Sequence, residues 1–460
     1  MSVTRHEQRE AQGVDRPVET PFSLRGDPWE VTYSGLIASR AKAYPEMVFK
    51  TLMHYFSIEH LRQAYREIEG SKAVGSDGIT KERYGEHLEE NLRNLHKRML
   101  KMAYRPASAK LVLIPKPDGK MRPIAISNFE DKLVQKIAAD ILTAIYDRAF
   151  QRFSFGFRPE RGCHGAIGYL YNKLRRHNLP WVVDVDLKSF FNTINHQKLI
   201  EILSLKISDK RFLRYIVRML KAGILVEGNC QESELGTPQG SIVSPILANI
   251  FLHHILDEWF VKTIQPELGG EMVRYADDVV VALASEEKAG EFVKRLERRL
   301  VDFGLSLNQD KTKTVGFGPP LADQKGTFDF LGFTFYWGRW MAEPTLKIRT
   351  SMKTLQKKIQ DFTHWIKGNR SRLRIEILWE KAAQKLRGHY QYYGVLWNRD
   401  KLLHFYNEVI GNLFRWLNRR SQKKSYTWEG FQMRLSTKPL PLPAVARRLV
   451  QLTDPRLYCA

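Results

Sequence analysis

The chain has 460 residues and a mass of 53.6 kDa, which corresponds to about three domains at roughly 150 residues each. Hydrophobic residues make up 43% of it, so a sizeable core is expected, and 73 Lys and Arg against 50 Asp and Glu give a net charge of +23. A protein this basic usually binds a polyanion, either nucleic acid or an anionic membrane surface. The sequence has no apolar run long enough to span a membrane and no recognisable secretory signal or transit peptide. Three distant cysteines exclude a disulfide framework or a Cys-pair zinc module, so a reducing cytoplasm is the expected compartment.

The first third of the chain is predicted to be mostly helical. Residues 1–45 begin with a polar stretch of mixed charge and are expected to form a mobile arm. Segments between 46 and 105 carry apolar residues at helical spacing. A β-hairpin is predicted for KLVLIPKPDG followed by MRPIAI, because two apolar runs flank a turn-forming Pro-Asp-Gly. A helix is predicted after it, for EDKLVQKIAADILTAIYDRAF.

The rest of the chain alternates short strands with amphipathic helices up to about residue 345. Strands are predicted for WVVDVDL and FDFLGFTFYWGRW, helices for IVSPILANIFLHHILDEWF and EEKAGEFVKRLERRLVDFGL, and a hairpin with an acidic tip for MVRYADDVVVALAS. Residues 345–430 return to helix and hold 19 Lys and Arg against 6 Asp and Glu, with aromatic residues interleaved. These bases form either solvated helix faces or, as the aromatic residues favour, a groove for a polyanion.

Four acidic residues interrupt apolar segments, and acids near a core require a partner or a metal ion. Asp184 and Asp186 lie in the strand predicted for WVVDVDL, where alternate residues share one face. Asp277 and Asp278 lie at the tip of the hairpin predicted for RYADDVVV. If these segments are neighbours, Asp186 and Asp277 can hold two Mg²⁺ ions, because hard cations prefer carboxylate oxygens and paired ions catalyse phosphoryl transfer. The alternative is a set of surface acids near strand ends.

The motifs and their order resemble those of reverse transcriptases. YADD after an apolar strand resembles their catalytic box, and Asp186 followed by Phe191 resembles their first acidic motif. The segment LGTPQGSIVSPILANIFLHHILDEW is similar to the one between these boxes, and YRPASAKLVLIPKPDGKMRPIAI is similar to the fingers hairpin. SFGFRPERGCHGAI, GLSLNQDKTK and FLGF also match in the family's order. The resemblance is strongest to bacterial group II intron-encoded reverse transcriptase/maturases, whose extra N-terminal motif is similar to KAVGSDGIT, and it covers residues 60–450.

The resemblance implies that Asp186, Asp277 and Asp278 are both the catalytic residues and the metal ligands. The implied cofactor is Mg²⁺, as two ions, with Mn²⁺ as a substitute. The implied reaction is in-line attack of a primer 3′-hydroxyl on the α-phosphorus of a dNTP.

Five residues are implied in nucleotide binding: Lys116, Arg122, Phe191, Gln239 and Lys311. Lys116 and Arg122, on the hairpin, would neutralise the triphosphate; the alternative is an ordinary salt bridge. The ring of Phe191 would leave no room for a 2′-hydroxyl and so favour dNTPs; the alternative is core packing. Lys311 would assist proton transfer to pyrophosphate or contact phosphate; the alternative is a solvated side chain.

Five further residues are implied in template and primer binding: Gly236, Pro238, Gly240, Leu331 and Gly332. The two glycines that flank Pro238 would let the backbone approach a base pair, or would form a plain turn. FLGF, which contains Leu331 and Gly332, would grip the primer strand, or would be a core strand.

Residues after FLGF resemble the family's helical thumb, called domain X. Its segment LRGHYQYYGVLWN suggests a tight helix contact with exposed rings, and Lys385, Arg387, Tyr392 and Tyr393 are the candidate RNA-binding residues. Lys and Arg on helices suit structured RNA, which is recognised by shape, phosphate and 2′-hydroxyl contacts. Many relatives continue into a DNA-binding region and a zinc-containing endonuclease, and this sequence lacks the cysteine pairs. The chain is therefore expected to be of the endonuclease-lacking type, which primes from an existing DNA end.

The expected fold is α/β (α+β), a right-hand polymerase with helical fingers, a small antiparallel-sheet palm and a helical thumb. The expected divisions are a mobile arm, an N-terminal extension with the fingers, the palm, the RNA-binding thumb and a short basic tail. Their predicted bounds are 1–45, 46–180, 181–340, 341–425 and 426–460.

The implied function is that of a group II intron reverse transcriptase, which copies RNA into cDNA and assists splicing as a maturase and intron mobility. Two alternatives stay open: a free-standing or defence-associated reverse transcriptase of the same lineage, and a splicing-only RNA-binding maturase. The expected partners are intron RNA and RNA template, a DNA primer or target, and dNTPs, with no membrane and with a monomer and a dimer both open. The expected location is the bacterial cytoplasm, in a ribonucleoprotein that joins the nucleoid when it acts on DNA.

Overall fold

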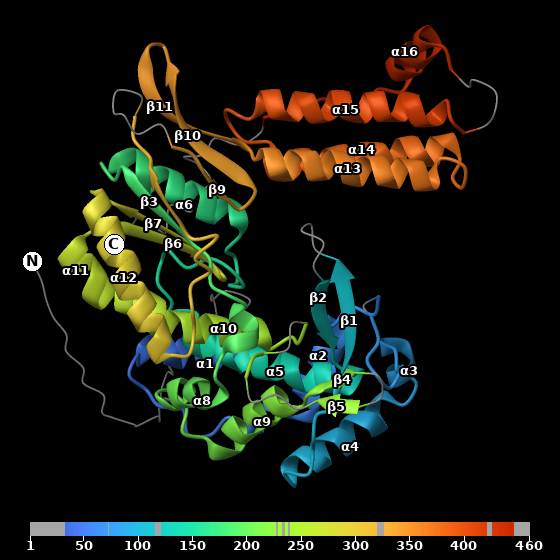
Figure 1. The fold of residues 1–460 in the computed structure, drawn as a ribbon. Helices are drawn as coiled ribbons and strands as arrows, with labels where there is room; N and C mark the ends of the chain where they lie inside the picture. Colours follow the sequence, from blue (N-terminus) through green and yellow to red (C-terminus); the bar gives the residue numbers. More distant parts are fainter. Residues whose placement is uncertain are drawn as a thin grey trace, which may run out of the picture.

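The computed structural model describes residues 33–71, 73–115, 121–226, 229–231, 235–237, 240–319, 326–420 and 426–445. Within these residues the chain forms two four-stranded sheets and one three-stranded sheet, with helices packed around them. Figure 1 shows the palm, which the middle of the sequence forms, with the fingers beside it and the long helices of the thumb above the fingers. The mixed helix and sheet fold with small antiparallel sheets that the sequence predicts is confirmed.

The palm is built on an antiparallel sheet with the strand order β6-β7-β3-β8. Its strands are β3 (Trp181–Val185), β6 (Glu271–Tyr275), β7 (Asp278–Leu283) and β8 (Lys313–Gly316). The register between the central strands pairs Trp181 with Leu283 and Val185 with Val279. After its first residue β7 is entirely buried, as expected of a valine-rich strand that is covered on both faces. Helix α12 (Glu286–Asp302) packs against β3, β7 and β8.

Further helices precede β3 or lie between β3 and β6 in the sequence. They are α6 (Cys163–Arg176), α7 (Phe190–Thr193), α8 (His196–Ser204), α9 (Lys210–Lys221), α10 (Ser244–Leu252) and α11 (Gln265–Leu268), with two π-helical turns, η3 (His253–Asp257) and η4 (Phe260–Ile264), between the last two. The carboxylate of Asp209 caps the N-terminus of α9 and also accepts a 2.6 Å hydrogen bond from the backbone of Leu52. This residue therefore ties the N-terminal part of the chain to α9.

The fingers combine helices with a hairpin. Their helices are η2 (Met53–Tyr55), α2 (Ile58–Glu67), α3 (Lys81–Gly85), α4 (Leu88–Leu100) and α5 (Phe129–Tyr146). The predicted hairpin is confirmed: β1 (Ala109–Pro115) pairs antiparallel with β2 (Met121–Ile126). Two short strands, β4 (Ile224–Val226) and β5 (Asn229–Gln231), extend this sheet, and β4 runs parallel to β1.

Part of the predicted N-terminal arm is a helix. The prediction of a mobile arm covers residues 1–45, but α1 (Tyr33–Ala43) lies within that range and packs against α5. The side chain of Ile37 is completely buried there, so burial of apolar surface holds this stretch in place. Residues 1–32 lie outside the described residues.

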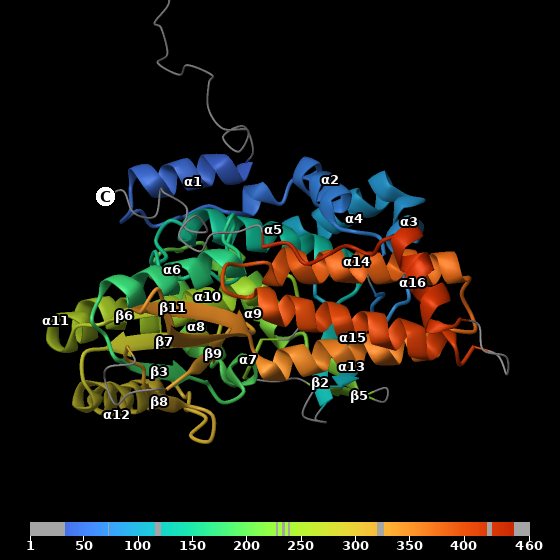
Figure 2. The same ribbon diagram turned by 90° about the horizontal axis from the view of Figure 1, so that it is seen from above.

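After the palm sheet the chain forms a three-stranded meander of β9 (Phe328–Phe330), β10 (Phe333–Trp340) and β11 (Glu343–Thr350), which leads into the thumb. It continues as α13 (Met352–Asn369), α14 (Ile375–Tyr393), α15 (Arg399–Leu417) and α16 (Trp428–Thr437). Seen from above, the first three helices lie side by side (Figure 2). Ser351 starts the bundle, because its hydroxyl caps α13 at the backbone of Thr354 while its own N–H donates to Gly332 O at 3.0 Å.

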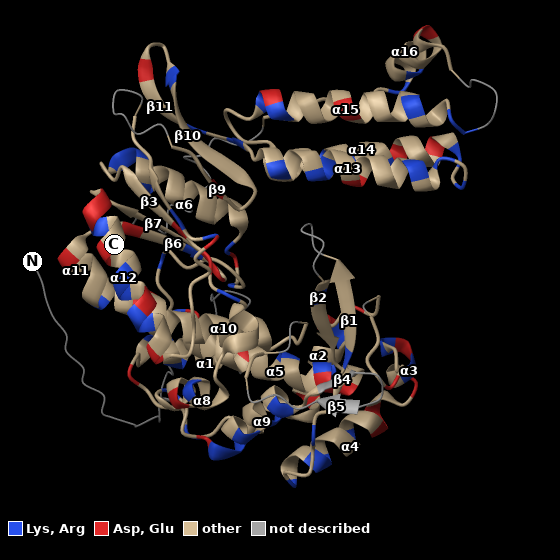
Figure 3. Ribbon diagram, viewed as in Figure 1, with Lys and Arg blue, Asp and Glu red and all other residues tan. Residues whose placement is uncertain are grey.

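Basic residues are distributed over many of these helices. Figure 3 shows Lys and Arg on the fingers helices and along α13, α14 and α15. Among the helices that the structure describes, none is long and apolar enough to cross a bilayer. The excess of positive charge therefore lies on amphipathic helices that pack on one another.

Candidate active site

Three acidic residues meet at one end of the palm sheet. Asp186 directly follows the last residue of β3, Asp277 lies in the turn that joins β6 to β7, and Asp278 begins β7. Because Val185 pairs with Val279, the next position along the two strands brings Asp186 opposite Asp278. The two acidic segments, which lie far apart in the sequence, are thus neighbouring strands.

The surroundings of these carboxylates disfavour their negative charge. Desolvation, together with repulsion from Asp277 and Asp186, raises the pKa of Asp278 to about 6. Desolvation and the charges of Asp278 and Asp186 raise the pKa of Asp184, inside β3, to about 7. Desolvation and Asp186 also raise the pKa of Asp277. Asp277 and Asp278 remain open to solvent on one side, so the protein withdraws part of their water and leaves an approach for a ligand.

The chemistry of this group fits a divalent cation. Its donors are carboxylate oxygens, which hard cations prefer, and their mutual repulsion is what a bound cation would relieve. Within the described part of the chain, no three His, Cys, Asp or Glu side chains already stand together as a complete ligand set. The fit therefore rests on the donor type and on the charge of the three acids.

The acidic turn is fixed by a buried arginine. Arg274 and Asp257 are both fully buried, and their paired contacts measure 2.7 Å from Nε to Oδ1 and 2.5 Å from Nη2 to Oδ2. The remaining N–H groups of Arg274 donate to Asn249 Oδ1 at 2.9 Å, to Ala276 O at 3.0 Å and to Ser154 Oγ at 2.7 Å. Every donor of the guanidinium is therefore used, and one of them holds the carbonyl of the residue before Asp277.

This network also determines the charge of its carboxylate. Burial alone would raise the pKa of Asp257, but the adjacent Arg274 guanidinium outweighs burial, and the pKa of Asp257 is lowered. The pair consequently stays ionised inside the palm, and its strength depends on both partners being present.

The turn itself is tightly confined. Ala276 has a left-handed φ of 56°, which is uncommon for a residue with a Cβ and typical of functional turns. A Cβ on Gly156 would lie 2.2 Å from the backbone nitrogen of Ala276, so only glycine lets the SFGFRPERG segment pass this close. Asn249 Nδ2 donates to Gly156 O at 2.6 Å and fixes this contact. The sequence pattern did not predict Arg274, Asp257, Asn249 or Gly156 as site residues.

Lys311 lies beside the acids. Its Nζ is 3.6 Å from Asp186 Oδ2, and its side chain is 65% exposed. The backbone of Asp186 is held by the same segment, since its carbonyl accepts from Asn308 N at 2.8 Å and its N–H donates to Thr312 Oγ1 at 3.3 Å. The predicted nucleotide-binding lysine is therefore in reach of the carboxylates, and Thr312 is an additional residue that orients Asp186.

Gly236 and Gly240, predicted to let the backbone approach a base pair, lie close to protein backbone. Gly236 has φ +87°, and a Cβ there would lie 2.9 Å from the backbone of α7. Gly240 has φ +116°, and a Cβ there would lie 2.5 Å from Ala125 O of β2. Phe191, in α7, accepts a 2.7 Å hydrogen bond from Thr237 N through its carbonyl, and its ring is half-buried. The absence of a side chain thus lets Gly236 lie against α7, which carries Phe191, and lets Gly240 lie against β2 of the hairpin.

Of the fingers and loop residues predicted for substrate binding, Lys116, Pro238 and Gln239 lie outside the described residues. Arg122 is described, and it is exposed on β2 opposite Ile114. Its positive charge opposes the rise in the pKa of Asp277, which puts the hairpin within electrostatic range of the acids.

The FLGF segment forms a turn against the thumb. Leu331 and Gly332 both have positive φ, 49° and 81°. Tyr392 Oη donates to Leu331 O at 3.0 Å, and a Cβ on Gly332 would lie 2.9 Å from the hydroxyl of Tyr393. The expectation of exposed rings is wrong for this pair, because Tyr393 is 7% exposed and Tyr392 is half-buried. Both rings pack where the thumb meets the palm.

The two basic residues predicted on the same helix are accessible. Lys385 and Arg387 are exposed on α14, and the Lys385 ammonium lies 5.0 Å from the centre of the Trp365 ring. The thumb therefore offers charge and aromatic surface together.

Replacing Arg274 by Met should lower the free energy of unfolding by roughly 3–5 kcal/mol, because it leaves the buried Asp257 carboxylate without a partner. Urea denaturation measures the loss. The double variant Arg274→Met, Asp257→Leu should recover part of it, since it removes both charges. A double variant no more stable than the single one would contradict the assigned pairing.

Replacing Asp278 by Asn should stabilise the metal-free protein at neutral pH. The pKa of Asp278 is raised from 3.8 to about 6, so the folded state carries an unfavourable charge above pH 6 that protonation removes as the pH falls. Thermal unfolding in a chelator should show a higher Tm for the variant above pH 6 and a shrinking difference toward pH 4. The exposed Asp302→Asn is the control, and an equal gain there would refute this explanation.

Comparison with known proteins agrees with this geometry. A family model described as reverse transcriptase (RNA-dependent DNA polymerase) matches residues 114–335, which hold the end of β1, all of β2 and all three acids. An uncharacterized 91 kDa protein in the cob intron of Schizosaccharomyces pombe is 35% identical over 234 residues, which are 50% of this chain and 28% of that protein. The group II intron-encoded protein LtrA of Lactococcus lactis is 33% identical over 250 residues, 51% of this chain and 41% of LtrA.

A further relative is covered over most of its length. Protein YkfC of Escherichia coli is 30% identical over 277 residues, which are 53% of this chain and 73% of YkfC. The chain thus spans less than half of two of these relatives and nearly three quarters of the third. The matched region carries the paired acidic strands and the turn between them, and the chain belongs to the reverse transcriptase family.

Proposed function

We propose that this protein is the RNA-directed DNA polymerase of a group II intron, which copies RNA into cDNA and assists splicing and mobility of that intron. The observation that carries the polymerase is the strand register, which sets Asp186 opposite Asp278 with Asp277 in the adjoining turn. The similarity to proteins named for the introns that encode them supports the biological setting.

In this proposal Asp186, Asp277 and Asp278 hold two Mg²⁺ ions, with Mn²⁺ as a substitute, and the ions supply the charge for nucleotidyl transfer when bound. The primer 3′-hydroxyl attacks the α-phosphorus of a dNTP, and pyrophosphate leaves. Arg274 keeps the turn carbonyl fixed, so the acids are held in position before substrate arrives. Lys311, which faces Asp186, and Arg122, whose charge acts on Asp277, bring positive charge to the triphosphate.

In this proposal Phe191 selects deoxyribose over ribose in the incoming nucleotide. Its ring is half-buried and packs edge-on against Phe190 at 5.4 Å, so it stands in a fixed position five residues after Asp186. A bulky ring under the sugar leaves no space for a 2′-hydroxyl, and the substrate is a dNTP.

The maturase role rests on the thumb. Residues 345–430 carry a net charge of +13, and exposed Lys385 and Arg387 lie on a helix with aromatic neighbours. Such a surface suits the phosphates and 2′-hydroxyls of folded RNA. The partners in this proposal are intron RNA, an RNA template, and a DNA primer or target.

The proposal also covers the group within the family and the cellular location of the protein. We assign the chain to the bacterial group of these proteins, supported by its bacterial relatives. The protein then works in the bacterial cytoplasm as a ribonucleoprotein and joins the nucleoid when it acts on DNA. Its net charge of +23 favours such polyanionic surroundings.

Extension of a DNA primer on an RNA template should require Mg²⁺ and dNTPs, and Asp277→Ala should reduce it by more than about 100-fold, since even groups that only orient metal ligands cost 10–100-fold. Gel analysis of the extended primer measures the loss. Asp302→Ala, an exposed acid at the end of α12, is the matched control and should extend normally. Full extension by Asp277→Ala would refute the metal site. Tight RNA binding without any extension by the wild-type chain would favour a splicing-only maturase.

Replacing Phe191 by Val should admit ribonucleotides. Removal of the ring relieves a steric exclusion of roughly 1–3 kcal/mol, so the preference for dNTPs over rNTPs should fall by roughly 10–100-fold. Single-nucleotide incorporation with matched dNTP and rNTP measures this ratio. Phe191→Tyr keeps the bulk and should keep the preference. An unchanged ratio in Phe191→Val would mean that another group selects the sugar.

A further inference from the structure

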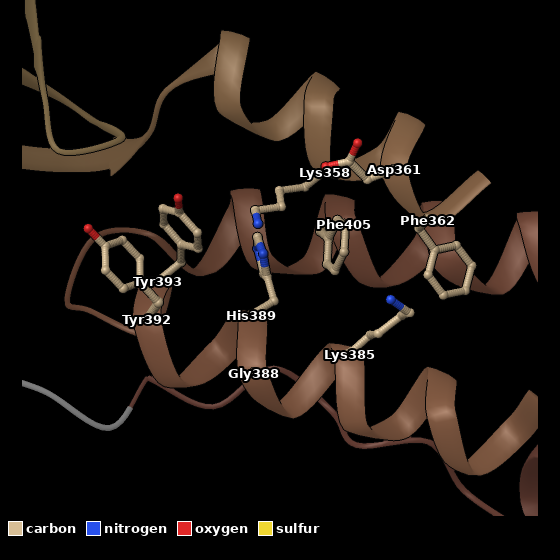
Figure 4. A pocket seen from close by; sticks show the side chains of 9 residues that line it. All are labelled: Lys358, Asp361, Phe362, Lys385, Gly388, His389, Tyr392, Tyr393 and Phe405. Atoms are coloured by element: carbon tan, nitrogen blue, oxygen red, sulfur yellow. The ribbon is translucent and has the colours of Figure 1, made fainter. Parts of the chain in front are cut away.

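The thumb contains a cavity that the proposed polymerase chemistry does not use. It has a volume of about 540 Å³ and lies between α13 and α14, with Phe405 of α15 at its back (Figure 4). This volume falls within the range of roughly 300–1,000 Å³ that is typical of sites for small organic ligands. Its walls combine aromatic rings with basic groups, from Lys358, Phe362, Lys385, His389, Tyr392 and Tyr393.

His389 points into this cavity with its hydrogen-bonding capacity unused. The residue is 6% exposed, and neither ring nitrogen has a partner. Its ring stacks on Phe405 with centres 4.0 Å apart, so it cannot turn away without losing that contact. Burial and the nearby charge of Lys358 lower the pKa of His389 to about 4, which keeps the imidazole neutral at physiological pH. A neutral imidazole has one donor and one acceptor, and buried groups of this kind normally have partners.

Two ammonium groups border the same space. Figure 4 shows Lys358 reaching from α13 toward the His389 ring, and Lys385 reaching inward from α14. Asp361 is the one acid among the residues that line the cavity, so the lining carries a net positive charge. The cavity therefore combines a site for an anion with a neutral polar group and ring surfaces.

The cavity opens toward the side where nucleic acid would lie. α13 and α14 form the side of the thumb that faces the β1–β2 hairpin, while α15 lies on the far side (Figure 1). Since Phe405 of α15 forms the back of the cavity, its opening is on the side of α13 and α14. Gly388 lies at its edge, and a Cβ there would meet nothing within 4 Å.

We propose that this cavity binds one unpaired nucleotide of the RNA, with the base beside His389 and the tyrosines and the phosphates at Lys358 and Lys385. The inference rests on the proposed function, because it takes RNA as the ligand of the thumb.

The combination of groups is what selects a nucleotide. Inorganic phosphate would use the lysines but would leave the neutral imidazole and the rings unused, whereas a nucleobase edge carries both donors and acceptors and a face for stacking. A base inside a duplex is stacked and paired and cannot enter a cavity of this size, so the nucleotide must come from a bulge, a loop or an end. Free nucleotides share this chemistry, and the experiment has to separate the two sources.

The test compares a hairpin RNA with a single bulged adenosine and the same hairpin without the bulge, by fluorescence anisotropy. The wild-type chain should bind the bulged RNA about tenfold more tightly, which is the usual contribution of one stacked base. Gly388→Leu should abolish the preference, because the new side chain fills the edge of the cavity from a position where it meets no neighbour. His389→Phe keeps the ring against Phe405, removes both nitrogens, and should reduce the preference.

Gly411→Leu is the matched control. Gly411 is also an exposed helical glycine where an added Cβ would meet nothing within 4 Å, but it lies on α15, away from the cavity opening. This variant should keep the full preference for the bulge. A preference that survives Gly388→Leu, or that disappears equally in Gly411→Leu, would overturn the assignment.

Two more results would overturn it and are distinguishable from failure of the polymerase. Absence of any preference in a wild-type chain that still extends a primer on an unstructured template would reject the cavity and leave the polymerase intact. In the second outcome the wild-type chain shows no preference for the bulged RNA but binds AMP, and Gly388→Leu abolishes AMP binding. This would assign the cavity to a free nucleotide instead of RNA.

Discussion

The catalytic end of the palm depends on the buried pair of Arg274 and Asp257. Both side chains are completely inaccessible, and the guanidinium connects a helix, a strand, the SFGFRPERG segment and the acidic turn. Hydrophobic packing would bury these elements together without fixing their relative position to a few tenths of an ångström. The guanidinium fixes their relative position, because its N–H groups point in fixed directions within one plane and each must meet an acceptor oxygen. The acids then project from a backbone that cannot relax when they repel each other.

Two exposed cations near the site partly offset the negative charge of its carboxylates. Lys311 approaches Asp186 while remaining mostly exposed, and Arg122 acts on Asp277 from the separate fingers hairpin. Both cations are exposed, so moving either one away from the acid it faces would leave no buried cation unpaired. The site thus combines a buried arginine that fixes the backbone with exposed bases that lie near the acids.

Elements with a regular pattern were predictable from the sequence, and contacts between distant segments were not. The hairpin of β1 and β2, the valine-rich β3 and the acidic turn after β6 all follow from strand patterning and turn residues. The partners of Arg274 come from positions 154, 249 and 257, and nothing in the chain's local pattern pairs them. The sequence did not reveal that Gly236 and Gly240 pass close to protein backbone, and their approach to a base pair stays a prediction. Similarly, an aromatic run in a basic helix does not reveal that Tyr392 and Tyr393 face the palm.

The position of Tyr392 gives the thumb a mechanical property. Its hydroxyl bonds to Leu331 O and its carbonyl lies 2.7 Å from His164 Nε2 of α6, so the last turn of α14 is held at two points on the palm. The helix has 19 residues and extends away from this anchor, and at 1.5 Å per residue it is a rigid arm of about 28 Å. One degree of rotation at the anchor moves its far end by about 0.5 Å. A change in the orientation of the FLGF turn would therefore displace the distal end of α14 more than the end that is anchored.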